Sequence, residues 1–397
     1  MAITTPSREV RLARWGVALL FWLNGATYAS LIPRYPELKQ ALDLSDTFWG
    51  LSIAVGPLGG LAAGLATAVL MRRFNSANVA VLSQVGAIVM INVVGNAPAA
   101  WVFAGGLFLM SAFDAVTDIS MNAHGLRVQR GYGRSILNSF HAWWSIGAVC
   151  GGFLGSTAAQ LGIPIWAQAL VLSVLFLALD VACRRMLLDG PDREAPAHRH
   201  EEPPASRLIP GPVLVRLAAL GVLAAAAGLI EDTAASWGAI YMDRAFVVVP
   251  FVAGMAFVAL QGTQMLGRFM GDGLVDRFGP RGALVQGTVI AAVGMGLALT
   301  FPSAAGTIIG FACAGWGVAT VIPSAMHAAD ELPGMRPGTG LTIVTWLLRL
   351  GFLAGPPLIG AIGDATSLRW ALFAVPACAV VMLALNWSLR PLRLPRA

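Results

Sequence analysis

Twelve apolar segments, each long enough to cross a lipid bilayer, recur along this sequence of 397 residues. A transmembrane α-helix needs about 20 predominantly apolar residues. The segments cover Leu12–Ile32, Thr47–Met71, Ser76–Gly95, Ala99–His124, Ile136–Gln160, Ile163–Leu187, Val213–Ala239, Val247–Phe269, Ala283–Thr300, Ala304–His327, Gly338–Gly363 and Leu368–Leu389. Only 12% of the residues are charged, about half the share found in soluble domains. The sequence therefore predicts an all-α integral membrane protein with 12 transmembrane helices.

The segments fall into two sets of six. Residues 188–211 between them are rich in Pro, Glu, His and Arg and have no apolar period, which is typical of a solvated linker. We expect an N-terminal six-helix bundle at residues 1–187, a cytoplasmic linker at 188–211 and a C-terminal six-helix bundle at 212–397. The Gly147-x-x-x-Gly151 pattern recurs about two hundred residues later as Gly351-x-x-x-Gly355. Such a repeat is typical of transporters whose halves move around a central site.

The distribution of lysine and arginine predicts the orientation in the membrane. With both termini in the cytoplasm, the inner loops and helix ends would carry 21 of the 26 Lys and Arg residues, Arg268 among them, and the outer loops only four. Positive charge concentrates in short cytoplasmic loops. We therefore expect a multi-pass protein of the bacterial inner membrane with both termini in the cytoplasm.

Two aspartates lie in the fourth apolar segment. Asp114 and Asp118 are four residues apart, so a helix places both carboxyl groups on one face. Each acid at membrane depth costs on the order of 3 kcal/mol, and such acids usually mark an ion or solute path. Structural ion pairs with neighbouring helices are the alternative. Because burial favours the neutral form of a carboxyl group, either aspartate is a candidate to carry a proton, with Asp118 favoured beside Asn122. Glu231 in the seventh segment is a third candidate for proton coupling.

Seven polar or aromatic side chains in the spans are candidates for binding a solute. They are Asn24, Asn122, Gln261, Gln264, Trp316, Trp346 and Arg349. Gln261 and Gln264 lie on one helix face, although amides at that depth also tie helices together. Arg349 lies too deep to reach the interface and stays charged, so it must face an acid or the cavity. A fixed ion pair with Glu231 would be structural, whereas release during the cycle would let Arg349 bind a carboxylate or hydroxyl of the solute.

The loop between the eighth and ninth segments carries a longer motif, Gly271-Asp272-Gly273-Leu274-Val275-Asp276-Arg277-Phe278-Gly279-Pro280-Arg281. It resembles the Gly-x-x-x-Asp-Arg-x-Gly-x-Arg signature of the major facilitator superfamily. The resemblance covers the whole chain and implies the major facilitator fold, with two pseudo-symmetric bundles of six helices. It also implies gating roles for Asp272, Asp276, Arg277 and Arg281. The matching loop of the first half has Arg72 in place of the aspartate and Asn75 in place of the glycine. The second loop is therefore expected to carry more of the gating.

Four shorter patterns are similar to the branch of bacterial permeases that resembles fucose permease. They are Asp118-x-x-Met121-Asn122-Ala123, Ser139-Phe140-His141-Ala142, Glu231 with Trp237 and Tyr241, and Gly355-Pro356-Pro357-Leu358-Ile359-Gly360. This resemblance implies proton-coupled movement of a small polar solute, for which a sugar is the first candidate, although many members of the branch have no assigned substrate. Fucose permease pairs an acid in its first span with one in its fourth, whereas the first span here offers Asn24.

The sequence thus indicates a monomeric secondary transporter of a small polar organic solute, sugar-like or carboxylate-bearing. The proton gradient would drive it, with the lipid bilayer as its surroundings and without a cofactor, metal or nucleic-acid partner. No metalloprotease, phosphate-binding, nucleophile or dinucleotide motif is present, so an enzyme is not expected. A proton-antiport exporter of drugs or metabolites is the alternative within transport. A solute receptor that does not transport is the alternative of another class, although it would have no need of intramembrane acids.

Overall fold

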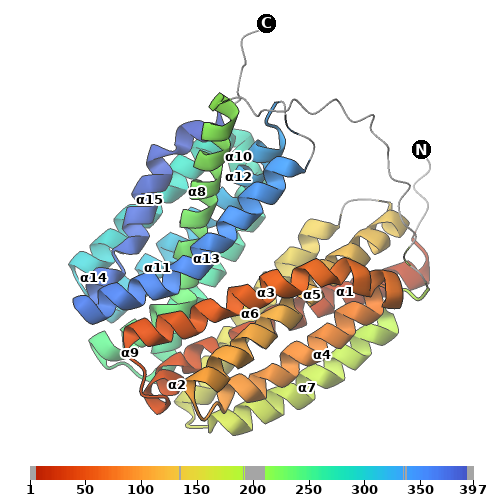
Figure 1. Cartoon of the computed structure of the whole chain (residues 1–397), viewed down its shortest axis with the longest axis horizontal. Coiled ribbons are helices and arrows are strands. Elements are labelled where there is room, and N and C mark those ends of the chain that lie inside the picture. Colours follow the sequence, from red (N-terminus) through yellow and green to blue (C-terminus); the bar gives the residue numbers. More distant parts are fainter. Residues whose placement is uncertain are drawn as a thin grey trace, which may run out of the picture.

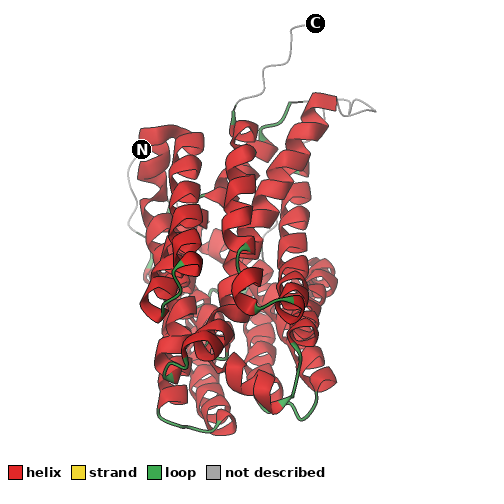
Figure 2. Ribbon diagram, turned by 90° about the vertical axis from the view of Figure 1, so that its left-hand side faces the viewer, coloured by secondary structure: helices red, strands yellow, loops and turns green. Residues whose placement is uncertain are grey.

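The structure is a computed structural model that describes residues 6–133, 136–190, 192, 211–333, 335 and 338–390, without the side chains of Asn138 and Asp272. Within these ranges every regular element is helical. The helices run roughly along one direction and are joined by short connections at the two ends (Figure 2). This arrangement keeps the backbone hydrogen bonds within each segment, as lipid requires.

The first six predicted spans each coincide with a long helix. These helices are α1 (Arg8–Ala29), α3 (Asp46–Phe74), α4 (Ser76–Gly95), α5 (Ala100–Tyr132), α6 (Leu137–Gln160) and α7 (Ile165–Met186). Two short elements, η1 (Ile32–Arg34) and α2 (Tyr35–Ala41), lie between α1 and α3. The fourth span was predicted to end at His124, whereas α5 continues to Tyr132 and so projects past the apolar segment.

The helices of the other six spans are interrupted or merged. The seventh comprises α8 (Gly211–Thr233), the π-helical segment η2 (Ala234–Gly238) and α9 (Ala239–Phe246). The eighth and ninth form one element, α10 (Pro250–Thr300), which bends at Gly279, where φ is +71°. The remaining elements are α11 (Ala304–Val318), α12 (Val321–Asp330), α13 (Thr339–Ala365), α14 (Leu368–Ala371), α15 (Ala374–Ala384) and η3 (Asn386–Leu389). Nine helical stretches within the described ranges are long and apolar enough to cross a membrane.

Glycines allow the same helix contact in both halves. A Cβ atom on Gly147 of α6 would lie 2.0 Å from the Trp22 carbonyl oxygen of α1. A Cβ atom on Gly351 of α13 would lie 2.1 Å from the Ala225 carbonyl oxygen of α8. Only a residue without a side chain permits such backbone contact. The repeated glycine pattern of the sequence thus corresponds to equivalent contacts, fifth span on first and eleventh on seventh.

The two halves meet at one end and in the middle of the molecule, and they separate toward the other end. We call the end where α7 finishes and α8 begins the linker side, and the end with α2 and α9 the far side. The halves lie together near α2, α9 and α14 and diverge toward the start of α8 (Figure 1). Within the described ranges, every hydrogen bond and ion pair between the halves is at the far-side ends of the helices. The structure is therefore closed on the far side and open on the linker side.

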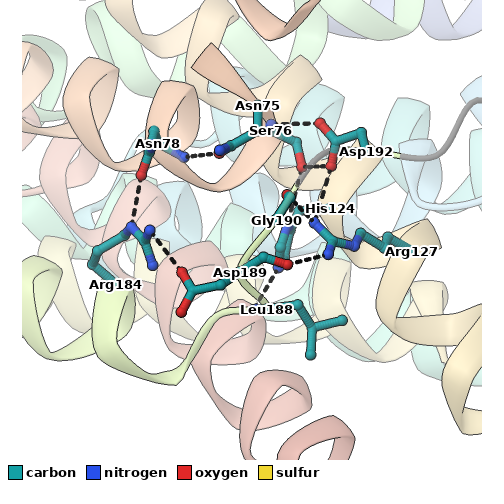
Figure 3. A network of polar contacts seen from close by, with 10 residues as sticks. All are labelled: Asn75, Ser76, Asn78, His124, Arg127, Arg184, Leu188, Asp189, Gly190 and Asp192. Carbon is teal, nitrogen blue, oxygen red and sulfur yellow. Dashed lines mark hydrogen bonds and ion pairs between the residues drawn. The ribbon is translucent and has the colours of Figure 1, made fainter.

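Hydrogen bonds and ion pairs hold the first residues of the linker against the N-terminal half (Figure 3). Both carboxylate oxygens of Asp192 accept hydrogen bonds from Ser76 at the start of α4, from its N at 2.6 Å and its Oγ at 2.7 Å. Arg127 of α5 lies 3.3 Å from the same carboxylate. The preceding loop has Arg72 where the superfamily signature has aspartate. The acid at this helix start therefore comes from the linker.

The buried side chain of His124 also binds this first part of the linker. The Leu188 backbone N–H donates to His124 Nε2 at 3.2 Å, and His124 Nδ1 lies 2.9 Å from Ser76 Oγ. Because Nε2 accepts, the neutral ring carries its proton on Nδ1 and donates to Ser76. Arg184 binds Asp189 at 2.9 Å on the outer side of the same network. Residues 191 and 193–210 of the predicted linker lie outside the described residues, and Gly211 begins α8.

Candidate functional site

A cavity of about 380 Å³ lies between the two halves at mid-depth. Helices α1 to α6 line it from one half, and α8, η2, α10 and α13 from the other. Six residues that the sequence singled out border it: Asn24, Asp114, Asp118, Glu231, Gln261 and Arg349. Most drug-sized ligands occupy pockets of similar or larger volume. We call this space the central cavity.

Asn24 of α1 connects three other helices at the edge of the central cavity. Its Nδ2 donates to Asp114 Oδ1 at 2.8 Å and to Gln84 Oε1 at 3.2 Å. Its Oδ1 accepts from Trp144 Nε1 at 2.8 Å. Asn24 is only 3% exposed and both of its N–H bonds are used, so it organises the wall and has no free donor for a solute.

Asp118 lies one turn further along α5, toward the linker side. Its side chain is accessible from the cavity, and Asn122 Nδ2 donates to its carboxylate at 2.9 Å. Asn122 does not itself border the central cavity. The two acids of this helix therefore differ in surroundings: an enclosed amide and indole network holds Asp114, and a single exposed amide holds Asp118.

Among the described residues that border the central cavity, Arg349 of α13 is the only cationic one. Its guanidinium lies beside Gly60 of α3, where a Cβ atom would be 3.7 Å from one nitrogen. Across the described part of the chain it has no hydrogen bond and no ion pair. A fixed pair with Glu231 is therefore absent from this conformation, and the planar donor fork faces the cavity unused.

Glu231 of α8 has partners on α10. Gln264 Nε2 donates to its carboxylate at 2.8 Å, and Arg268 lies 3.7 Å from the same oxygen. Arg268 was expected among the cytoplasmic helix ends, and the structure shows that its side chain also reaches an intramembrane acid. The spacing of Gln261, Gln264 and Arg268 is the signal that was available, because three and four residues apart they form one polar stripe on a helix.

The seventh span brings a further acid to the cavity just before its π-helical segment. Asp232 borders the cavity and accepts a hydrogen bond from Ser236 Oγ at 2.9 Å. The backbone carbonyl of Ser236 accepts from Trp49 Nε1 of the other half at 3.2 Å. A π-helix interrupts regular backbone pairing and is often found at functional sites. The sequence did not single out Asp232, Tyr28 or Trp144, which also border the cavity.

Two predicted aromatic contacts lie elsewhere. The side chain of Trp346 is 49% exposed on the outside of α13, and Trp316 packs near Gly267 between α10 and α11. Neither borders the central cavity. Trp144 occupies that place instead. The sequence alone could not show this, since the orientation of a tryptophan on a helix depends on the partner helix.

The predicted gating residues lie on the linker side. Asp276 and Arg277 are exposed, and Arg277 stacks on the Phe278 ring with 5.2 Å to its centroid. Arg281 donates to Asn386, which ties the loop to the end of the twelfth span. The side chain of Asp272 lies outside the described residues. In this linker-side-open state Asp276 has no ion pair within the described ranges.

A second space lies between the two halves toward the linker side. It has a volume of about 640 Å³ and is bordered by α6 from one half and by α10 and α12 from the other. His141 and Arg268 border it, and no acid does so among the described residues. We call it the vestibule. Among its described lining residues only Arg268 carries a permanent charge, whereas four acids surround the central cavity.

The far side is closed by an aspartate that caps a helix of the opposite half. Asp364 at the end of α13 accepts hydrogen bonds from the first backbone N–H groups of α3, from Asp46 at 2.9 Å and Thr47 at 2.8 Å. The N-terminus of a helix favours a negative charge in this position. A Cβ atom on Gly360 would lie 2.2 Å from the Asp46 carbonyl oxygen, so the two helix ends touch directly.

A charged pair adds to this closure. Asp46 binds Arg244 of α9 at 2.7 Å and Lys39 of its own half at 3.0 Å. Sequence reasoning assigned no gating role to Asp46, Arg244 or Asp364. Nothing in the sequence alone brings residues 46 and 364 together, because their meeting depends on how the two halves dock.

Comparison with known proteins agrees with this architecture. Residues 220–397 match the model of the Major Facilitator Superfamily. An uncharacterized MFS-type transporter of Yersinia pestis is 27% identical over 358 residues, which is 88% of this chain and 88% of the relative. The membrane protein MosC of Rhizobium meliloti is 25% identical over 380 residues, covering 96% of this chain and 90% of the relative.

Solved structures share the fold at lower identity. The nucleoside transporter NupG superimposes with a TM-score of 0.75 at 11% identity, covering 95% of this chain and 98% of that one. FucP in its outward conformation superimposes with a TM-score of 0.61 at 16% identity, covering 97% and 100%. Both structures contain the same two-bundle fold.

Proposed function

Because the chain belongs to the major facilitator superfamily, and is therefore a multi-pass membrane transporter and not an enzyme, we propose that it moves a small polar organic solute across the bacterial inner membrane. The solute is sugar-like or carboxylate-bearing, and the protein is a proton-coupled secondary transporter that works by alternating access. Both termini and the linker face the cytoplasm in this proposal, as the distribution of arginines indicates.

The observation that carries this proposal is the central cavity. It lies between two halves whose mutual hydrogen bonds and ion pairs, within the described ranges, are all on the far side, so a rocking motion about it would expose it to each side in turn. Its wall combines acids, which can bind a proton, with the unpaired guanidinium of Arg349, which can bind a carboxylate or hydroxyl. Such a combination suits a solute that is rich in oxygen atoms.

Two acids in different surroundings support proton coupling. Asp118 is accessible from the cavity and held by Asn122, whereas Asp114 is enclosed by Asn24. The proton affinity of an intramembrane carboxyl group changes when the group moves between a hydrated and a desolvated environment. One proton would therefore bind with the cavity open to one side and leave when it opens to the other.

A binding screen followed by uptake tests the proposal. Purified protein would be screened by thermal shift against neutral sugars, sugar acids, nucleosides and other organic acids. A ligand at 100 times its Kd stabilises the folded state by about 2.7 kcal/mol. Ligands that bind would then be tested for uptake into proteoliposomes with and without a pH gradient. Solute accumulation that requires the pH gradient supports the proposal. Uptake that is the same with and without the pH gradient, whichever way the gradient is directed, contradicts proton coupling.

A further inference from the structure

Asn24, Asp114 and Trp144 form one hydrogen-bonded unit with a single permitted orientation. An indole N–H can only donate, so the Asn24 group that faces Trp144 must be the carbonyl oxygen. The NH₂ group must then face Asp114 and Gln84. The amide cannot flip without placing a donor against a donor and an acceptor against a carboxylate.

The surrounding helices hold this orientation. The backbone contact between α1 and α6 at Gly147 keeps Asn24 and Trp144 in register. Gln84 of α4 is fully buried, and its Nε2 donates to Thr27 Oγ1 at 3.0 Å, so its own amide is also fixed. The bond from Asn24 to Asp114 is therefore the one contact of this unit that the surrounding helices do not fix.

We infer that Asn24 is a positioning residue that transmits the protonation state of Asp114 to Trp144, and so to the surface that meets the solute. This inference rests on the proposed function. An ionised Asp114 accepts a charge-assisted hydrogen bond, which is roughly twice as strong as the neutral bond left after protonation. Because hydrogen bonds in a chain polarise one another, the bond from Trp144 to Asn24 weakens as well.

The coupling runs in both directions. A solute that contacts the Trp144 ring prefers one placement of that ring, and through Asn24 it changes how tightly Asp114 holds a proton. Linkage requires the two effects to be equal, and couplings between sites typically amount to roughly 5- to 150-fold in affinity. Asn24 is thus a link between proton and solute although its own donors do not reach the cavity.

Other ionisable groups share the central cavity with Asp114. They are Asp118 of α5, Tyr28 of α1, Tyr35 of α2, Glu231 and Asp232 of α8, and Arg349 of α13. The described lining residues of α3, α4, α6 and α10 include no ionisable group. Of these groups, only Asp114 is connected to Trp144 through Asn24 within the described part of the chain.

Fluorine NMR tests this link without any solute. The 12 tryptophans would be replaced biosynthetically by 5-fluorotryptophan, and the Trp144 signal would be identified by its loss in Trp144→Phe. In the wild-type protein we expect the Trp144 signal to shift with pH in a single titration. The shift should vanish in Asp114→Asn and in Asn24→Leu, and it should persist in Asp118→Asn, the matched acid one turn away.

Two results would overturn the inference. One is a Trp144 signal that does not move with pH in the wild type, and the other is a titration that survives in Asn24→Leu. If Asn24→Leu does not fold, Asn24→Ser decides, because its side chain is polar but too short to join both partners. An intact titration combined with accumulation that ignores the pH gradient would instead contradict the proposed function alone.

Discussion

Removing the carboxylate of Asp364 should loosen the far-side closure. Asp364 accepts two hydrogen bonds from the first N–H groups of α3, and these bonds join the two halves. Replacing a helix-capping side chain with alanine costs about 1 kcal/mol, within a range of 0.5–2 kcal/mol. The favourable charge at a helix N-terminus adds about 0.3–1 kcal/mol at an exposed site. Together these terms amount to about 1.3–2 kcal/mol, so we expect Asp364→Ala to lower the ratio of far-side-closed to far-side-open molecules by roughly 10- to 30-fold.

Electron-electron distance measurements between spin labels would detect this change. Labels at Leu161 and Val247, exposed residues near the far side of the two halves, would be introduced after the four native cysteines are replaced. Asp364→Ala should increase the population of long distances, and Asp364→Asn, which keeps an acceptor but loses the charge, should have an intermediate effect. Glu37→Gln is the matched control, because Glu37 pairs with Arg34 of its own half. An unchanged distance distribution in Asp364→Ala would refute the reasoning.

Three further changes test other parts of the account. Arg349→Lys keeps the charge but loses the donor fork, so solute binding should weaken at least about tenfold at unchanged melting temperature; affinity retained within a few-fold would make Arg349 structural. Asp276→Asn should favour linker-side opening, since an acid bridging helix ends there contributes about 1–3 kcal/mol when paired; an identical linker-side distance distribution would remove Asp276 from gating. Gly147→Ala should lower stability by about 1–3 kcal/mol because its Cβ would lie 2.0 Å from the Trp22 carbonyl oxygen, and an unchanged thermal midpoint would contradict that contact.

The membrane-spanning helices could be predicted because apolar runs and helix caps are local features of the sequence. Ser76–Gly95 was predicted with the bounds that the structure has, since Asn75 caps the helix start and the apolar run ends where the polar loop begins. The bend at Gly279 was less visible. The sequence predicted a loop there, whereas α10 runs through residues 270–278 as helix and turns only where φ becomes positive. Apolar length identifies a span, but it does not show how far a helix continues beyond the membrane.

The site was predictable residue by residue but not as an arrangement. Intramembrane polarity alone singled out Asn24, Asp114 and Arg349, and all three border the central cavity. Their partners depend on which helices become neighbours, and a single sequence does not contain that information. Trp144 illustrates this limit, because its role comes from a bond to a residue 120 positions away. The meeting of Asp364 with Asp46 depends on the docking of two bundles and on the conformation adopted.

Proton movement driven by the solute tests the central claim most directly. Proteoliposomes containing a pH-sensitive dye would be given a solute identified by thermal shift, with no gradient applied beforehand. We predict that the solute changes the internal pH through the wild-type protein. The change should be lost in Asp114→Asn or Asp118→Asn, although these variants still bind or exchange the solute. Solute entry with no proton movement in the wild type, or equal proton movement in both variants, would contradict proton-coupled transport through the central cavity.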